Sequence, residues 1–143
     1  MTPRRIYVAS SWKNPSQPRV VFALREDGHE VYDFRHPEPG ERGFHWEETG
    51  APPLPWDART YRHVLTHPLA RKGFEADMRA LSRCDVVVLV LPAGRSSSWE
   101  MGWAMGRGKL AIVLMEELTA DPELMFSGAD IVGSLNELLG FLR

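Results

Sequence analysis

The segment from Asp85 to Pro92 constrains the fold of this chain more than any other. Its sequence, Asp-Val-Val-Val-Leu-Val-Leu-Pro, is apolar at nearly every position and rich in β-branched residues. A strand with one solvated face alternates polar and apolar residues, so an unbroken apolar run indicates a strand covered on both faces. The segment therefore predicts a central strand of a parallel sheet with helices on both sides.

Strand-like and helix-like segments alternate around this strand. Strands are predicted at residues 6–9, 29–34, 110–115 and 129–132, and helices at 15–26, 57–64, 68–83, 99–107 and 134–142. This alternation implies right-handed βαβ units. We predict an α/β fold with a flavodoxin- or Rossmann-like doubly wound parallel sheet of about five strands, in three α/β/α layers. At 143 residues, one domain spanning residues 1–143 is expected.

Residues 36–56 interrupt the alternation. Proline and glycine break any regular pattern there, although Phe44, Trp46 and Trp56 lie in the same stretch. A loop of this length in a compact domain is usually functional or disordered, and the aromatic residues argue against disorder. We expect this Pro/Gly-rich loop to be a lid or a contact surface.

Charge and cysteine content narrow the partners and the compartment. The net charge is −2, which gives no electrostatic reason to bind a nucleic acid polymer or an anionic membrane. Cys84 is the only cysteine, so an intrachain disulfide is impossible and a reducing compartment is expected. No signal-peptide core is evident, and the longest apolar run is too short to cross a bilayer. We therefore expect a cytoplasmic protein.

No motif indicates a cofactor or a metal. His63 and His67 have a spacing that can bind zinc on a helix, but no third ligand is evident. The dinucleotide fingerprint, the P-loop and the Gly-x-Ser-x-Gly elbow of hydrolases are all missing from the sequence. We expect neither a metal nor a bound cofactor.

The loop after the Asp85–Pro92 strand carries the strongest signal for a ligand. Ligands of parallel α/β sheets bind at the carboxyl ends of the strands. A helix start favours an anion, and hydroxyl groups with an arginine add donors and positive charge suited to a phosphate. Alternatively, one serine caps the helix and the others are solvated turn residues. The candidate phosphate-binding residues here are Gly94, Arg95, Ser96, Ser97 and Ser98.

Further candidates lie at the same edge or on the preceding helix. Glu100 is expected in the first turn of its helix, and its apolar and small neighbours predict partial burial; the alternative is a carboxylate that complements the helix dipole. Ser11 and Lys13 follow the first strand, where a ligand would lie, or form an ordinary turn. By pattern alone, Tyr7 is a core residue and Asp77 a surface carboxylate.

Taken together, these residues resemble the nucleoside 2-deoxyribosyltransferase-like superfamily. The resemblance is carried by the run from Ile6 to Ser11, by Asp77 eight residues before Asp85, and by residues 94–109, which run Gly-Arg-Ser-Ser-Ser-Trp-Glu-Met-Gly-Trp-Ala and end at Gly108-Lys109. It covers most of the chain and is strongest over residues 73–114. It implies a flavodoxin-like fold, usually dimeric, that cleaves the N-glycosidic bond of nucleosides or nucleotides.

The resemblance also implies roles for particular residues. Glu100 would be the nucleophile at the sugar C1′, and Asp77 an acid that contacts the sugar or helps proton transfer. Tyr7 and Ser11 would line the site. In this family a serine of the neighbouring subunit can contact the phosphate, and Ser127 is the candidate in the expected homodimer.

Two branches of the family differ beside the 5′ position of the substrate. Nucleoside transferases typically carry an acidic residue before the catalytic glutamate, whereas nucleotide N-hydrolases carry serines that suit a 5′-phosphate. Arg95 and three serines stand here without an acid, and a carboxylate would repel a phosphate. We therefore expect an N-glycosidase of a nucleoside 5′-monophosphate, although Lys13 stands where such hydrolases can carry arginine. The alternatives are a 2-deoxyribosyltransferase, a NAD-cleaving or nucleotide-sensing domain, or a dimeric binding module without activity.

Overall fold

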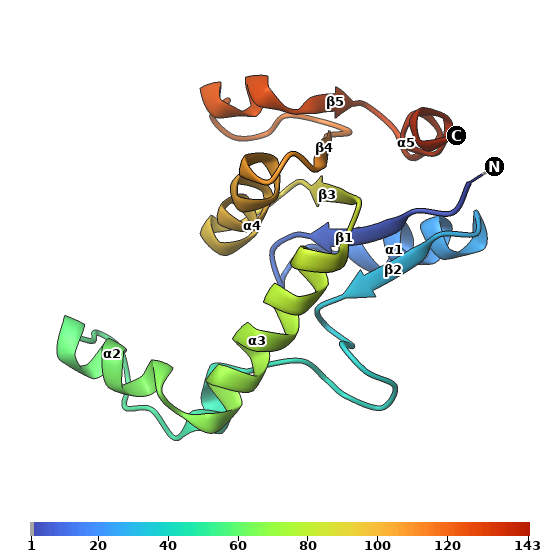
Figure 1. Cartoon of the computed structure of the whole chain (residues 1–143). Helices are drawn as coiled ribbons and strands as arrows, with labels where there is room; N and C mark the ends of the chain where they lie inside the picture. Colours follow the sequence, from blue (N-terminus) through green and yellow to red (C-terminus); the bar gives the residue numbers. More distant parts are fainter. Residues whose placement is uncertain (1) are drawn as a thin grey trace. The chain divides into compact units, whose positions relative to one another are not determined.

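Figure 1 shows the computed structural model of the chain, which describes residues 2–143. The chain forms two compact units. The sheet unit comprises the residues up to Asp33 together with Leu81–Arg143, and the insert unit comprises Phe34–Ala80. A compact unit need not be an independent domain, and the single domain over residues 1–143 stays a prediction.

The sheet unit contains five parallel strands in the order β2-β1-β3-β4-β5. The strands are β1 (Arg5–Ala9), β2 (Glu30–Asp33), β3 (Val86–Val90), β4 (Leu110–Leu114) and β5 (Asp130–Val132). The helices of this unit are α1 (Gln17–Glu26), α4 (Arg95–Gly106), the 3-10 helix η2 (Leu124–Gly128) and α5 (Leu135–Leu142). This strand order is the flavodoxin-like order, and it confirms the predicted fold class.

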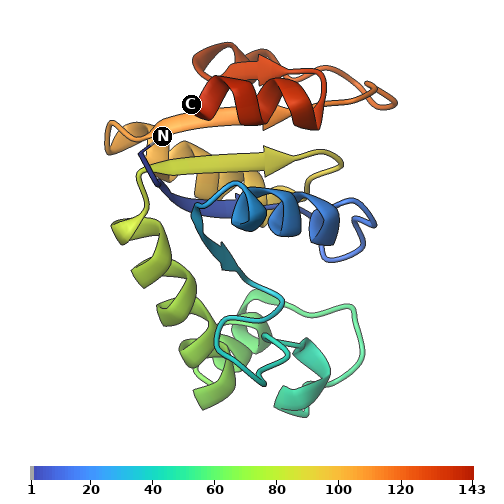
Figure 2. The same ribbon diagram turned by 90° about the vertical axis from the view of Figure 1, so that its right-hand side faces the viewer.

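Helices cover both faces of the sheet. Figure 2 shows α1 and α5 in front of the strands and α4 behind them. The front layer shares one hydrophobic core with the sheet, in which Val20 and Leu24 of α1 and Leu138 of α5 pack with the strands. On the opposite face, Met101 and Ala104 of α4 are buried. The unit is therefore the three-layer α/β/α arrangement expected from the sequence.

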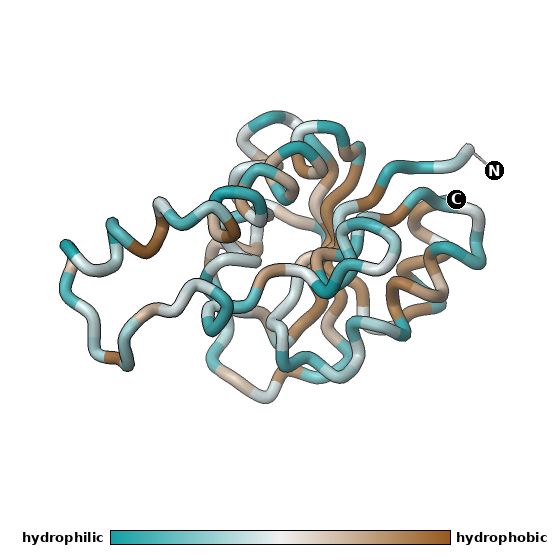
Figure 3. Tube along the Cα trace, turned by 90° about the horizontal axis from the view of Figure 1, so that it is seen from below, coloured by the Kyte–Doolittle hydropathy of each residue, from teal (hydrophilic) through white to brown (hydrophobic). Residues whose placement is uncertain are grey.

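The central strand has the environment that its sequence predicts. All five residues of β3 are buried, and β3 pairs with β1 on one side and β4 on the other. Figure 3 shows the hydrophobic residues gathered along the strands, with hydrophilic residues on loops and outer helix surfaces. Because β3 lies in the middle, its carboxyl end is the natural centre for loops that form a site.

Local sequence signals set most helix boundaries in the sheet unit. α1 ends at Glu26, where the N–H of Asp27 still donates to the Ala23 carbonyl and Gly28 turns the chain at φ +94°. The αL conformation of Gly28 is easily adopted by glycine, as the Asp-Gly stop signal predicts. α5 begins after Ser134, whose hydroxyl accepts a hydrogen bond from the Glu137 N–H. This capping confirms the predicted start of the last helix.

The insert unit contains the Pro/Gly-rich loop and two helices. They are α2 (Ala58–Leu65), which Asp57 caps by accepting a hydrogen bond from the Thr60 N–H, and α3 (Pro68–Arg83), whose last turn belongs to the sheet unit. Within residues 36–56 the one helical segment described is the 3-10 helix η1 (Trp46–Thr49). The role of the loop as lid or contact surface stays a prediction.

Aromatic side chains hold the insert unit together. Trp46 makes edge-to-face contacts with Phe44, Trp56 and Tyr61, at ring-centroid distances of 4.9, 5.8 and 6.3 Å. A Cβ atom at Gly73 would lie 3.0 Å from the Phe44 Cβ, so α3 can approach Phe44 because residue 73 has no side chain. The loop therefore packs on α2 and α3 through its aromatic side chains, in spite of its proline and glycine content.

Candidate active site

Tyr7 and Glu100 form the centre of the candidate site. The Tyr7 hydroxyl donates a hydrogen bond to Oε2 of Glu100, although the two residues are 93 positions apart. Tyr7 lies on β1 with none of its surface exposed, and its ring stacks on Tyr32 of β2 at 5.2 Å. Glu100 is half-buried on α4, as the sequence predicts. A rigid phenol therefore orients a carboxylate that solvent still reaches.

The start of α4 differs from the sequence prediction. The helix was expected to begin at Trp99, but it begins at Arg95, so Glu100 lies in the second turn and not in the first. Gly94 is the N-cap, and the Ser97 hydroxyl accepts from the Gly94 N–H at 2.8 Å and donates to the Gly94 carbonyl at 2.9 Å. These two hydrogen bonds explain the early start of α4, because backbone N–H groups at a helix start have no partner within the helix and the Ser97 hydroxyl provides one for Gly94.

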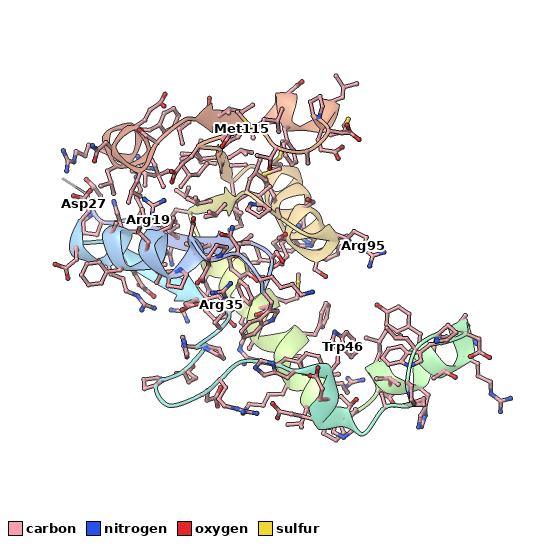
Figure 4. All side chains as sticks on the ribbon, turned by 180° about the vertical axis from the view of Figure 1, so that it is seen from behind. Arg19, Asp27, Arg35, Trp46, Arg95 and Met115 are labelled. Atoms are coloured by element: carbon pink, nitrogen blue, oxygen red, sulfur yellow. The ribbon has the colours of Figure 1, made fainter. Side chains whose placement is uncertain are left out.

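The serines of this segment consequently have different environments. Ser97 is buried, with 2% of its surface exposed, and its hydroxyl is engaged with Gly94. Ser96 is exposed and Ser98 half-buried in the same turn. Arg95 is exposed, and Figure 4 shows its side chain extending outward from the start of α4. The alternative that a serine caps the helix is not what the structure shows, because Gly94 is the N-cap and Ser97 supports it from the third helical position. The hydroxyls of Ser96 and Ser98 and the guanidinium of Arg95 stay candidates for contact with a phosphate.

The loop after β1 lies against the loop after β3. The Ser11 N–H donates to the Pro92 carbonyl at 3.4 Å, and the Ser11 hydroxyl accepts from the Lys13 N–H at 3.2 Å. Ser11 is half-buried and the Lys13 side chain is exposed. The structure therefore places Ser11 and Lys13 at the carboxyl edge of the sheet, where ligands of such folds bind.

Asn14 is a residue of this loop whose role the sequence did not reveal. Only 1% of its surface is exposed, and its amide donates to the carbonyls of Val90 and Pro92 at 3.1 and 3.2 Å. The N-cap of α1 is Ser16, which makes no side-chain capping bond. Asn14 instead accepts the Ser16 N–H at 2.8 Å. The one sequence signal for a special role of Asn14 was its position, as a polar residue directly before Pro15.

The remaining candidates lie on other elements. Asp77 is half-buried on α3, within the insert unit. Ser127 lies exposed on η2, where its hydroxyl donates to the Leu124 carbonyl at 2.7 Å. The roles of both residues stay predictions of the resemblance. Among residues 2–143, no group of three or more His, Cys, Asp and Glu side chains is placed to hold a metal ion, and no helix has the length and apolar character needed to span a bilayer.

Comparison with known proteins identifies the fold. No protein-family model matches the chain, and no curated protein does. Solved structures do match. One is the 2-deoxyribosyltransferase of the psychrotolerant bacterium Bacillus psychrosaccharolyticus, with a TM-score of 0.55 over 94% of this chain and 89% of that one. The chain has a nucleoside 2-deoxyribosyltransferase-like fold. Because sequence identity to that structure is 19%, the likeness establishes the fold, and the activity has to be argued from the site.

Proposed function

We propose that this chain is an N-glycosidase that hydrolyses the bond between base and sugar in a nucleoside or deoxynucleoside 5′-monophosphate. The observation that carries the proposal is the hydrogen bond from the buried Tyr7 hydroxyl to Glu100 at the carboxyl edge of the sheet. The transferase named for the similar structure acts on the same class of bond, which supports nucleoside chemistry.

Glu100 serves as the nucleophile in this reaction. As the bond from C1′ to the base breaks, its electron pair leaves with the base nitrogen and C1′ gains oxocarbenium character. The Glu100 carboxylate attacks C1′ and forms a glycosyl ester, while an acid protonates the departing base. Water then hydrolyses the ester, which frees the sugar phosphate and regenerates the carboxylate. By resemblance, Asp77 is the residue we propose as that acid.

Tyr7 holds Glu100 in position for attack. Its ring cannot swing away, because it is fully buried and stacked on Tyr32. A neutral hydroxyl can fix one carboxylate oxygen without neutralising the negative charge with which Glu100 attacks C1′. Tyr7 is therefore a catalytic residue in this proposal, in contact with the attacking group.

The first turn of α4 supports the choice of a monophosphate. It offers Arg95, Ser96 and Ser98 together with the N–H groups of a helix start, and the dipole of α4 favours an anion there. Residues 92–98 contain no carboxylate that would repel a phosphate. Ser11 and Lys13 supply a further hydroxyl and a cation at the same edge.

The resemblance further leads us to propose a homodimer in which Ser127 of one subunit contacts the phosphate bound to the other. Ser127 is exposed, as that role requires. Size determination in solution tests the dimer, and Ser127→Ala tests the contact through the KM for the monophosphate. A monomer with full activity would overturn this part of the proposal.

The second candidate is a transferase that moves 2-deoxyribose between bases. The observation that favours it is the likeness to a 2-deoxyribosyltransferase over most of both chains. In that case a second base, in place of water, attacks the glycosyl ester on Glu100. The two reactions share the first half and differ in the acceptor.

One experiment separates these functions. The protein is incubated with nucleosides, their 5′-monophosphates and NAD, and released base is followed by chromatography, beside Glu100→Gln and the exposed-carboxylate control Glu26→Gln. We expect base release from a monophosphate that Glu100→Gln abolishes and Glu26→Gln retains. Release that requires a second base would favour the transferase. No release from any substrate would exclude both and favour a sensor or binding module.

A further inference from the structure

We propose that Asn14 is a positioning residue for the candidate site, which ties the end of β1 to the end of β3 and thereby holds Glu100 within reach of Tyr7. The proposal rests on the proposed function in taking Glu100 as the reacting group. Its structural content can nevertheless be tested without any activity.

Hydrogen bonds fix both ends of the Asn14 side-chain amide. Nδ2 donates to the carbonyls of Val90 at 3.1 Å and Pro92 at 3.2 Å, and Oδ1 accepts from the Ser16 N–H at 2.8 Å. The reverse orientation of the amide would turn its oxygen toward two carbonyl oxygens and its NH₂ toward an N–H donor. One orientation therefore satisfies the buried amide.

The bonds begin where the strand pairing ends. The last paired residues of β1 and β3 are Ala9 and Leu89, so the carbonyls of Val90 and Pro92 lie beyond the ladder on the β1 side. On the other side of β3, the Leu91 N–H still donates to the Leu114 carbonyl at 3.1 Å. Asn14 thus adds side-chain bonds between the two segments beyond the point where the pairing of β1 with β3 ends.

The backbone of the same loop reinforces this tie. The Ser11 N–H donates to the Pro92 carbonyl, and the Asn14 N–H donates to the Ser11 carbonyl at 3.1 Å. The Pro92 carbonyl therefore accepts from both Ser11 and Asn14. Loss of the Asn14 amide would remove this donor from the carbonyl of the buried Val90, and because buried carbonyls are satisfied in native structures, the segment would be favoured to move.

The hydrogen bonds of Asn14 join the segment that follows Tyr7 to the segment that precedes Glu100. Tyr7 stands on β1, before the loop that holds Asn14, and Gly94 follows Pro92 by two residues and caps the helix that carries Glu100. A shift of Pro92 would be transmitted through Gly94 to the start of α4. Misplacement of a reacting group by about 1 Å can lower the rate by about 100-fold.

Lys109 provides a matched control at the opposite end of β3. Its Nζ donates to the carbonyls of Ser82 at 2.9 Å and Cys84 at 2.7 Å, so it also satisfies two backbone carbonyls with one side chain. Lys109→Met removes a comparable tie at the amino end of the strand. A purely structural role of Asn14 would make the two substitutions equivalent.

The first arm of the test compares Asn14→Ala with Lys109→Met, well below the unfolding midpoint of each variant. With a nucleoside 5′-monophosphate as substrate, we expect kcat to fall by about 10- to 100-fold in Asn14→Ala and to change less than about twofold in Lys109→Met. Equal kcat values for Asn14→Ala and the wild type, or equal losses in both variants, would overturn the proposal.

The second arm measures amide hydrogen exchange at Gly94 and Ser98, whose N–H groups are bonded at the start of α4. We expect exchange there to rise about tenfold in Asn14→Ala and to stay unchanged in Lys109→Met. Unchanged exchange in Asn14→Ala would overturn the positioning role, whereas a wild type inactive on every substrate would overturn the proposed function alone. If Asn14→Ala does not fold, Asn14→Ser, which keeps one donor, is measured in both arms.

Discussion

The two edges of the sheet use polar side chains in different ways. At the amino edge, charged groups pair with each other: Arg5 with Asp85 at 3.0 Å, and Arg143 with Asp27 at 2.9 Å. At the carboxyl edge, an ion pair joins Arg19 of α1 to Glu116 after β4. The residues of the candidate site are nevertheless held by neutral groups there, with Asn14 on backbone carbonyls, Ser97 on Gly94 and Tyr7 on Glu100. Under the proposed function, the amino edge stabilises the fold, whereas the neutral groups of the carboxyl edge position the Glu100 carboxylate for reaction.

The pKa of Asp85 fits this distinction. Hydrogen bonds from the Arg5 side chain and backbone lower the pKa of the Asp85 carboxyl below its usual value of 3.8. A carboxylate held ionised by a cationic partner at the surface is a poor nucleophile and a structural group. The pairing of Asp85 with Arg5 at the amino edge therefore supports a structural role for this carboxylate.

The largest effect that the comparison predicts is on the two carboxylates themselves. Glu100→Gln should lower base release by at least about 1,000-fold, because the nucleophile is removed, while the unfolding midpoint changes little. Asp85→Asn should leave kcat unchanged. The rate of base release and the urea unfolding midpoint are measured for both variants. Equal activity of the two variants would contradict the functional difference between the edges.

The next effect concerns the hydroxyl that holds Glu100. Tyr7→Phe keeps the buried ring and its stacking on Tyr32 but removes the donor to Glu100. We expect kcat to fall by about 10- to 100-fold, since orientation of a reacting group is lost while the group remains. Steady-state kinetics check this result, with Tyr32→Phe as the control. Full activity of Tyr7→Phe would show that Glu100 needs no such partner.

A third prediction concerns pH and the amino edge. His29 is buried, its Nδ1 accepts the Arg4 N–H at 3.1 Å, and burial lowers its pKa below the usual 6.5 against the opposing effect of Asp27. The unfolded chain then binds more protons, so the neutral form of His29 contributes stability that is fully present above pH 6.5. This stability is lost as the pH falls from 6.5 to the lower folded pKa.

Urea denaturation across this pH range measures the effect. The free energy of unfolding of the wild type should fall as the pH decreases below 6.5, and the curve of His29→Gln should be flatter, because glutamine keeps an acceptor for Arg4 but does not titrate. Arg4 and Asp27 face the ring in both proteins, and Arg143 is paired with Asp27. Parallel curves for the two proteins would contradict this account of His29.

The smallest effect expected is on stability at the Arg5–Asp85 pair. Both side chains are about half exposed, and exposed ion pairs contribute little. Asp85→Asn should therefore lower the urea midpoint only slightly at neutral pH, and the difference from the wild type should vanish as the pH falls through the lowered pKa of Asp85. A large loss would mean that this pair does more than fasten β1 to the segment before β3.

Local sequence patterns were sufficient to predict the fold of the sheet unit. The apolar run of β3, the Asp27-Gly28 stop and the Ser134 cap are each readable within a few residues. The predicted start of α4 was wrong because serine and glycine are typical of turns. In the structure, the Ser97 side chain stabilises an earlier helix start by bonding to the backbone of Gly94.

The contacts that define the candidate site could not be predicted in the same way. Asn14 meets Val90 across 76 residues, and Tyr7 meets Glu100 across 93. A local sequence pattern cannot predict contacts between residues so far apart in the chain. The family resemblance placed Tyr7 and Glu100 in one site, but it assigned no role to Asn14. A buried asparagine and a solvated turn asparagine have the same sequence context, and only the folded sheet distinguishes them.

The most direct measurement of the central claim is the identification of the residue that becomes glycosylated. A 2′-fluoro-substituted nucleoside 5′-monophosphate should slow the second half of the reaction, because fluorine disfavours the oxocarbenium-like transition state. Mass spectrometry of the intact protein and its peptides should then find one sugar phosphate bound to Glu100, and none on Glu100→Gln. An adduct on another residue, or undiminished base release by Glu100→Gln, would contradict the account.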